Sequence, residues 1–236
     1  MNESNLSKAW PRAILFDLDG TLIDSAPDLH AAVNILIARR GLGPLSLDQV
    51  KSMIGNGVKK LVERAFAACG VSLSGEALEA EHLAMIDVYG DHLTVLTTLM
   101  PGVPDVIEAV REDGVQVAVV TNKPQRAAEA ILDDLGLSPY LDAVIGGDAG
   151  VEKKPAPDML LAALDVLGVA PEDALAVGDS PVDVAAARAA GVLIAAVRGG
   201  YTTVAVEELG ADAVIDGLDL LSGAIASLRP AERFPA

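Results

Sequence analysis

Short apolar runs alternate with amphipathic segments over most of the chain. Five runs are mostly apolar on both faces, and they cover residues 13–16, 115–121, 143–147, 174–178 and 192–197. A strand without a polar face is typical of the buried interior of a parallel sheet. The pattern therefore predicts five strands of one parallel sheet.

Helical segments separate most of these strands. Apolar residues recur at helical spacing in residues 104–113, 125–135, 157–167 and 182–190. Two of these segments begin with a proline, which the first turn of a helix tolerates. Strands that alternate with helices predict an α/β fold, with a parallel sheet covered by helices on both faces.

Residues 25–92 break this alternation, because their pattern is helical throughout. Ser46 and Gln49 have the spacing of a capping box, and another helix is expected to start near Ser74. We predict a small all-helical domain inserted after the first strand, with hinges near 23–27 and 93–101. The predicted division is a core of residues 1–24 and 95–236 with a helical domain of residues 25–94.

The composition excludes several classes of partner. The chain has 236 residues, of which 51% are hydrophobic, and its formal net charge is −17. Nucleic acid and anionic membrane surfaces both need a basic face, so neither is expected to bind. The single cysteine, Cys69, excludes an intrachain disulfide and a thiolate metal cluster. An anionic substrate would need a local cation to approach this protein.

The ends of the chain carry no targeting signal that we can identify. The first twelve residues lack a basic start followed by an apolar stretch, and no apolar run is long enough to span a membrane. We expect a soluble cytoplasmic protein that is a monomer or a homodimer. Residues 1–11 and the final segment, LRPAERFPA, are predicted to be tails.

Polar residues collect where the predicted strands end. Asp17 and Asp19 follow the first strand, Thr121 and Asn122 end the second, and Asp179 ends the fourth. Ligands of open α/β sheets bind beyond the carboxyl ends of the strands. These side chains are therefore expected at one edge of the sheet.

A cluster of carboxylates at this edge needs compensation. Two like charges about 4 Å apart repel by roughly 4 kcal/mol at an effective dielectric constant of about 20. Either the pKa values of the aspartates rise or a cation lies among them. Oxygen ligands without a cluster of histidine or cysteine favour a hard cation, and Mg²⁺ is the natural choice.

Four segments together resemble the motifs of the haloacid dehalogenase superfamily of phosphohydrolases: DLDGT (17–21), VVTNK (119–123), KKPAPDM (153–159) and VGDSPVDVAAARAAG (177–191). The resemblance implies a Rossmann-like core with a helical cap domain, and Mg²⁺-dependent hydrolysis of a phosphomonoester through an aspartyl-phosphate. Within the superfamily, the segments IGNGVKKLVERAF, MPGV and VVTNKP are most similar to phosphoglycolate phosphatases. The expected substrate is therefore a small phosphorylated acid, 2-phosphoglycolate.

The resemblance also implies roles for the aspartates. Asp17 would be the nucleophile, and Asp19 the general acid and base. Mg²⁺ would bind the carboxylates of Asp17 and Asp179 and the backbone carbonyl of Asp19. Asp183 could hold a metal-bound water, or it could only place negative charge in the first turn of its helix, and the two interpretations are equally supported.

The other two motifs supply the expected phosphoryl contacts. The Thr121 side chain and the backbone N–H of Asn122 would bind phosphoryl oxygens. Lys154 would neutralise charge on the phosphoryl group and on Asp17. We choose Lys154 over Lys153 because the lysine of the family directly precedes the proline.

The helical domain offers a possible contact to the substrate carboxylate. Gly55, Asn56 and Gly57 come just before a predicted helix, whose free N–H groups could face an anion. The same residues could form nothing more than a turn. Arg64 is a weaker candidate, because Arg64, Lys59 and Lys60 together fit a solvated helix face better.

Several other functions remain open at this point. A phosphatase for pyrophosphate, a nucleotide or a sugar phosphate would share these motifs, while a sugar phosphomutase usually has valine in place of Thr21. A dehalogenase would lack an acid at Asp19. A receiver-type signalling domain would also accept a phosphoryl group on an aspartate, but it lacks an equivalent of Asp19 and needs no helical insert.

Overall fold

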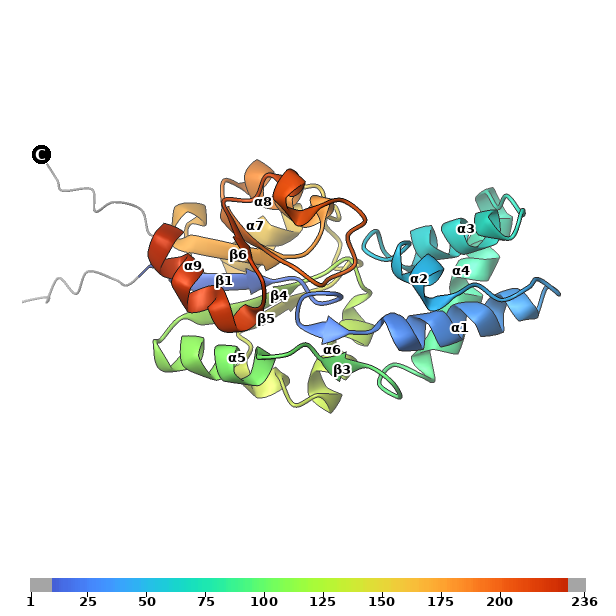
Figure 1. Cartoon of the computed structure of the whole chain (residues 1–236), viewed down its shortest axis with the longest axis horizontal. Helices are drawn as coiled ribbons and strands as arrows, with labels where there is room; N and C mark the ends of the chain where they lie inside the picture. Colours follow the sequence, from blue (N-terminus) through green and yellow to red (C-terminus); the bar gives the residue numbers. More distant parts are fainter. Residues whose placement is uncertain (1–9, 229–236) are drawn as a thin grey trace, which may run out of the picture.

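The computed structural model of the chain describes residues 10–228. Its centre is a six-stranded parallel sheet with the strand order β5-β4-β1-β6-β7-β8 (Figure 1). The strands are β1 (Ala13–Phe16), β4 (Gln116–Val120), β5 (Ala143–Ile145), β6 (Ala174–Gly178), β7 (Leu193–Val197) and β8 (Ala213–Ile215). The α/β prediction and its five strands are confirmed, whereas the edge strand β8 was not predicted.

Helices cover both faces of this sheet, as β1 shows most clearly. Ile14 and Phe16 face one hydrophobic core with the helices α5 and α6, whereas Ala13 and Leu15 face the other core with α7 and α8. The helices of the sheet are α5 (Val103–Glu112), α6 (Gln125–Asp134), α7 (Asp158–Leu167), α8 (Pro181–Ala190) and α9 (Leu221–Leu228). The four predicted helices are confirmed to within one residue at each end.

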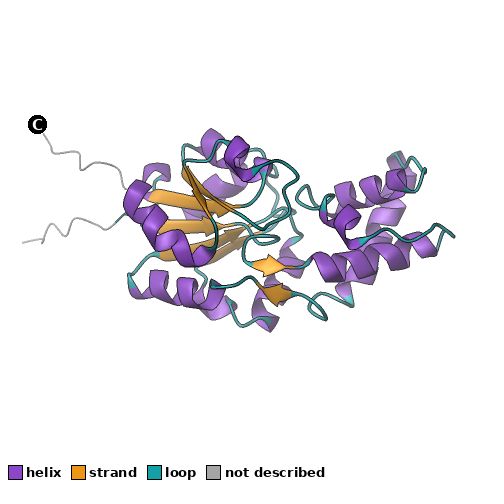
Figure 2. Ribbon diagram, in the orientation of Figure 1, coloured by secondary structure: helices purple, strands orange, loops and turns teal. Residues whose placement is uncertain are grey.

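The insert is helical, as predicted, and has a hydrophobic core of its own. It consists of α1 (Ala26–Ala38), α2 (Leu47–Lys51), α3 (Val58–Ala68) and α4 (Gly75–Gly90), which lie together beyond one end of the sheet (Figure 2). Ser46 and Gln49 form the predicted capping box at the start of α2. Ser74 is the N-cap residue of α4.

Two short strands connect the insert to the sheet. β2 (Ile23–Asp24) pairs antiparallel with β3 (Thr98–Leu99), and both lie at the expected hinges. The buried carboxylate of Asp28 accepts hydrogen bonds from the backbone N–H groups of Leu96 and Thr97. The two connections of the insert are thus held together, while the division at residues 24–25 and 94–95 stays a prediction.

The predicted N-terminal tail is too long. Trp10 donates a hydrogen bond to the carbonyl of Glu172 and packs on the core, and Pro11 is buried. The remainder of that tail and residues 229–236 of the C-terminal one lie outside the described residues. None of the helices between residues 10 and 228 has the length and apolar character needed to cross a membrane.

Candidate active site

The strand order brings the predicted site residues to one edge. β1 lies between β4 and β6, and Phe16 is level with Val119 on one side and with Val177 on the other. Asp17, Thr121 and Asp179 come shortly after these positions, so the neighbouring strands carry all three to the same end of the sheet. This part of the prediction follows from parallel pairing and is confirmed.

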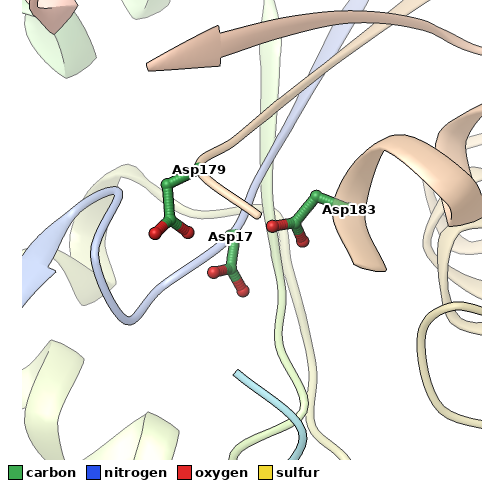
Figure 3. A group of neighbouring side chains, drawn as sticks. All are labelled: Asp17, Asp179 and Asp183. Carbon is green, nitrogen blue, oxygen red and sulfur yellow. The ribbon is translucent and has the colours of Figure 1, made fainter. Parts of the chain in front are cut away.

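Asp17, Asp179 and Asp183 form a cluster of three carboxylates (Figure 3). One oxygen from each lies within 4.8 Å of the others. The side chain of Asp17 is 12% exposed and that of Asp183 is 6% exposed. Asp183 also caps α8, because its Oδ2 accepts a hydrogen bond from the N–H of Ser180 at 3.1 Å. Asp183 therefore lies both beside the possible metal site and in the first turn of its helix, which are the two locations that its alternative roles require.

The cluster carries more negative charge than its surroundings compensate. The pKa of Asp17 is raised to about 7, because burial and, to a smaller extent, the charge of Asp183 raise it more than the Lys154 ammonium lowers it. The pKa of Asp179 is raised well above its usual range by burial and then by Asp183 and Asp17. Three converging carboxylates fit a hard divalent cation, which would restore their ionised form. The described residues thus include three aspartates that could hold a metal ion.

Lys154 is the cation of this cluster. Its ammonium group donates to Oδ1 of Asp17 at 2.7 Å, to Oδ1 of Asp183 at 2.6 Å and to the carbonyl of Val120 at 2.8 Å. Burial lowers the pKa of Lys154, but the two carboxylates raise it more, so the net pKa is above its ordinary value. Lys153 is exposed, in agreement with the choice between the two lysines.

Asp19 has a separate set of neighbours. Its Oδ1 accepts hydrogen bonds from Oγ of Ser25 at 2.5 Å and from Nζ of Lys123 at 2.8 Å. Its Oδ2 accepts none from the residues that the structure describes. Gly20 allows the close approach of this loop to Asp179, since a Cβ there would lie 2.7 Å from Oδ2 of Asp179. One oxygen of Asp19 is thus fixed and the other is free to exchange a proton.

Lys123 is a site residue that the sequence pattern did not identify. Its side chain is only 2% exposed and lies against Asp19. The signal was its place directly after Thr121 and Asn122 in a strongly acidic chain. Thr121 and Asn122 are themselves buried, and the Asn122 amide donates to the carbonyls of Gly55 and Lys154, both at 3.0 Å.

Tyr201 is a second residue that the sequence pattern did not identify. Its N–H donates to Oδ2 of Asp179 at 2.5 Å, and its hydroxyl donates to Oδ1 of Asp24 at 2.7 Å. The same hydroxyl accepts the N–H groups of Ser25 and Ala26 at the start of α1. Tyr201 therefore links the carboxylate cluster to the first hinge, and its place in a loop after β7 gave no signal.

A pocket lies between the sheet and the insert. The core contributes five lining residues, which are Asp17, Asp19, Thr121, Asn122 and Lys123. The insert contributes a mostly apolar wall, which consists of Leu29, Ile54, Gly55, Gly57, Val58 and Leu61. The insert thus forms one wall of the pocket that contains Asp17, Asp19 and Thr121.

The predicted contacts in the insert divide into two groups. Gly55 and Gly57 line the pocket, and Gly57 is the N-cap residue of α3. Asn56 and Arg64 are absent from the lining, because Arg64 donates to Oδ1 of Asn56 at 2.8 Å and to the carbonyl of Met53 at 2.8 Å. Arg64 thus supports the loop of residues 53–57. The substrate roles of these residues stay predictions.

Comparison with known proteins identifies the family. A sequence model described as haloacid dehalogenase-like hydrolase matches residues 11–191. The chain belongs to the haloacid dehalogenase-like hydrolases. It is 44% identical over 193 residues to phosphoglycolate phosphatase 1 of Pseudomonas aeruginosa, a match that covers 81% of this chain and 71% of that protein. It is 39% identical over 218 residues to phosphoglycolate phosphatase of Chromobacterium violaceum, with 92% and 94% covered.

A solved structure of this hydrolase family has the same fold. It belongs to a predicted phosphoglycolate phosphatase from Haemophilus somnus, is 30% identical, and superposes with a TM-score of 0.84 over 90% of this chain and 97% of the other. This haloacid dehalogenase-like hydrolase is thus an enzyme with the family's α/β core and helical insert.

Proposed function

We propose that this hydrolase is a Mg²⁺-dependent phosphomonoesterase that converts 2-phosphoglycolate to glycolate and phosphate through an aspartyl-phosphate. One observation carries the proposal: Asp17 lies in a carboxylate cluster with a lysine on one side, while Asp19 presents a free oxygen in the same pocket. This arrangement fits a nucleophile and a separate acid and base.

In the proposed reaction, a carboxylate oxygen of Asp17 attacks phosphorus and the bond from phosphorus to the alkoxide oxygen breaks. Oδ2 of Asp19 gives its proton to that oxygen, because Oδ1 is held by Ser25 and Lys123. A water then attacks the aspartyl-phosphate, and Asp19 takes back a proton from it. Phosphate leaves and Asp17 is restored.

The remaining residues of the site stabilise charge. Mg²⁺, held by the carboxylates of Asp17 and Asp179 and the backbone carbonyl of Asp19, would offset the charge of the transferring group. Lys154 neutralises Asp17, and Thr121 and Asn122 bind phosphoryl oxygens. Asp183 supports both the metal site and Lys154.

The substrate assignment is supported by the relatives and by the pocket. Two relatives named phosphoglycolate phosphatase align with most of this chain. The pocket is narrow and closed by aliphatic side chains, which suits a small acid rather than a nucleotide. We also expect the enzyme to act in the cytoplasm as a monomer or homodimer.

The test is the Asp17→Asn variant, assayed on 2-phosphoglycolate with Mg²⁺. We expect kcat to fall by at least about 10³-fold, which is typical of the loss of a nucleophile. Asp165→Asn, an exposed position on α7, serves as the control with unchanged kcat. Turnover of Asp17→Asn close to the wild-type value would exclude Asp17 as the nucleophile.

A panel of phosphoesters tests the substrate separately. We expect kcat/KM for 2-phosphoglycolate to exceed the values for pyrophosphate, a nucleoside monophosphate and a sugar phosphate. Equal values across the panel would contradict the assignment and leave a general phosphatase. A phosphorylated protein that persists for minutes would instead support a receiver-type switch.

A further inference from the structure

The pocket has one positively charged side chain among its described lining residues, and it is Lys123. A small phosphorylated acid has two anionic ends. The proposed function accounts for the phosphoryl end by the aspartate cluster, Lys154 and Thr121. No cation has been assigned to the carboxylate end, for which the loop of residues 55–57 is the one predicted contact. In a chain of net charge −17, that end needs a cation.

Lys154 is unable to supply this cation as well. An ammonium group has three hydrogen-bond donors, and all three of Lys154 are used by Asp17, Asp183 and the carbonyl of Val120. Lys123 has a hydrogen bond to Oδ1 of Asp19 and to no other described side chain or carbonyl oxygen. The Lys123 ammonium therefore has fewer oxygen partners than Lys154 among the described residues.

The surroundings of Lys123 prepare it for an anion. Its Nζ lies 4.8 Å from the centre of the Tyr89 ring, which belongs to α4 of the insert. The Tyr89 hydroxyl is buried and has no hydrogen-bond partner among the described residues. Burial lowers the pKa of Lys123, but Asp19 and Tyr89 together raise it more, so the net pKa is above its ordinary value. The ammonium that lines the pocket thus lies against the ring of a tyrosine whose hydroxyl has no partner among the described residues.

Lys123 also has a suitable position along the chain. It comes two residues after Thr121, in the loop that is expected to bind the phosphoryl oxygens, and it contacts Asp19. In 2-phosphoglycolate one carbon separates the carboxylate from the phosphoester oxygen. One loop can therefore contact both ends of so short a molecule.

We propose that Lys123, assisted by the Tyr89 hydroxyl, binds the carboxylate of the substrate and selects phosphorylated acids over neutral phosphoesters. This inference depends on the proposed function, whose substrate it explains. A neutral analogue leaves the buried donors unpaired, and such mismatches are what give enzymes strong discrimination. The alternative is that Lys123 only positions Asp19. In that case Lys123 would not affect the preference of the enzyme between the two kinds of substrate.

The experiment compares two substrates of nearly equal size, 2-phosphoglycolate and 2-hydroxyethyl phosphate, in which CH₂OH replaces the carboxylate. In Lys123→Met we expect kcat/KM for 2-phosphoglycolate to fall by about 10²-fold or more, mainly through KM. The value for 2-hydroxyethyl phosphate should change far less. Lys59→Met, at an exposed position on α3, is the control and should leave both values unchanged.

Two further variants test the inference even if the Lys123→Met protein fails to fold. Tyr89→Phe removes the hydroxyl and should lower the preference for 2-phosphoglycolate several-fold. Lys123→Arg keeps the charge and should retain much of the preference. If these variants and Lys123→Met reduce kcat equally for both substrates, Lys123 only positions Asp19 and the inference is wrong. A wild-type enzyme without preference for 2-phosphoglycolate would contradict the proposed function itself.

Discussion

At the scale of single residues, the acidic side chains of the site differ in their hydrogen-bond donors. Asp17 faces Lys154, Asp19 faces Ser25 and Lys123, and Asp183 faces Ser180 as well as Lys154. When one oxygen of a carboxylate accepts a hydrogen bond from a buried ammonium group, the other oxygen remains available for reaction. The three residues are all aspartates, so their different neighbours account for their different proposed roles as nucleophile, proton carrier and supporting residue.

The two alternative roles of Asp183, in the metal site and in the cap of α8, can be tested directly. The metal-site interpretation predicts that Asp183→Asn raises the Mg²⁺ concentration for half-maximal activity by roughly 10- to 100-fold. Loss of the cap on α8 alone would lower the free energy of unfolding by about 1 kcal/mol and leave the Mg²⁺ requirement unchanged. Mg²⁺ titration of activity and urea unfolding measure the two effects.

Ser46→Ala is the matched control for this variant, because it breaks the capping box of α2 in the insert. It should lower stability by a similar amount without any change in the Mg²⁺ requirement. If Asp183→Asn behaves like Ser46→Ala, then Asp183 is only a capping residue.

The sequence predicts these residues unequally. Asp17, Thr121 and Asp179 could be placed because each follows an apolar strand, and parallel strands end at one edge. The role of Lys123 depends on Asp19, 104 positions away, and on Tyr89 in another domain. No local pattern contains such contacts, so the place of Lys123 after Thr121 and Asn122 was its only signal, and Tyr201 had none.

At the scale of elements, the loop of residues 54–57 is one of the contacts between the insert and the sheet. The carbonyl oxygen of Gly55 accepts a hydrogen bond from the side-chain amide of Asn122. A Cβ on Gly57 would lie 3.3 Å from the backbone carbonyl oxygen of Asn122. Gly57 also has a φ of +84°. The start of α3 therefore approaches the phosphoryl-binding loop more closely than a side chain would comfortably allow.

Gly57→Ala is expected to disturb this approach. The positive φ costs about 1 kcal/mol of stability, and the added methyl pushes the insert away from Asn122. We expect KM for 2-phosphoglycolate to rise about tenfold, since a loss of roughly 1.4 kcal/mol of binding free energy has that effect. Steady-state kinetics and urea unfolding give the two quantities.

The same helix supplies the control. Gly70 follows α3 and has a φ of +81°, and a Cβ at this position would have nothing within 4 Å. Gly70→Ala therefore also places a side chain at positive φ, but without the contact. It should lose stability like Gly57→Ala and keep the wild-type KM. Equal KM values for the two variants would show that the insert does not need this close approach.

The helices and strands were predicted well where they are long enough to show a hydrophobic periodicity. The helices of ten or more residues and the buried strands of the centre gave clear patterns. β2 and β3 have two residues each, so their hydrophobic pattern contains no full repeat. β8 has three residues with the same sequence, AVI, as the predicted strand β5, so its length does not explain why it was not predicted. The pairing of β2, β3 and β8 depends on the geometry of the hinge and of the sheet edge rather than on their own sequence.

At the scale of the whole molecule, charge is the dominant constraint. A protein with a net charge of −17 keeps three aspartates together at the end of its sheet. In the absence of a cation these groups favour their protonated forms, as the raised pKa values of Asp17 and Asp179 indicate. The free energy of unfolding should therefore depend on both pH and Mg²⁺.

The direction of this dependence follows from Asp17. Its pKa is raised from 3.8 to about 7 in the folded protein, so between these values the unfolded chain binds fewer protons than the folded one. Stability of the metal-free protein should fall as pH rises through this range. Mg²⁺ needs the ionised carboxylates, so its affinity should rise with pH, by up to about tenfold per unit for each proton released. At a Mg²⁺ concentration of about 100 Kd the gain is about 2.7 kcal/mol.

Thermal unfolding with Mg²⁺ or with a chelator, at about pH 6 and about pH 8, measures this coupling. For a chain of this size a gain of about 2.7 kcal/mol corresponds to roughly 5–10 °C in Tm, and we expect the larger shift at the higher pH. Asp17→Asn removes both the titrating group and a ligand, so its Tm should respond little to Mg²⁺ and its metal-free stability should fall less between the two pH values. A Mg²⁺ shift that is independent of pH, or equal in the wild type and Asp17→Asn, would mean that Asp17 neither titrates near neutrality nor binds the ion. The metal would then act elsewhere on this acidic protein, because the carboxylate cluster could not hold it without releasing protons.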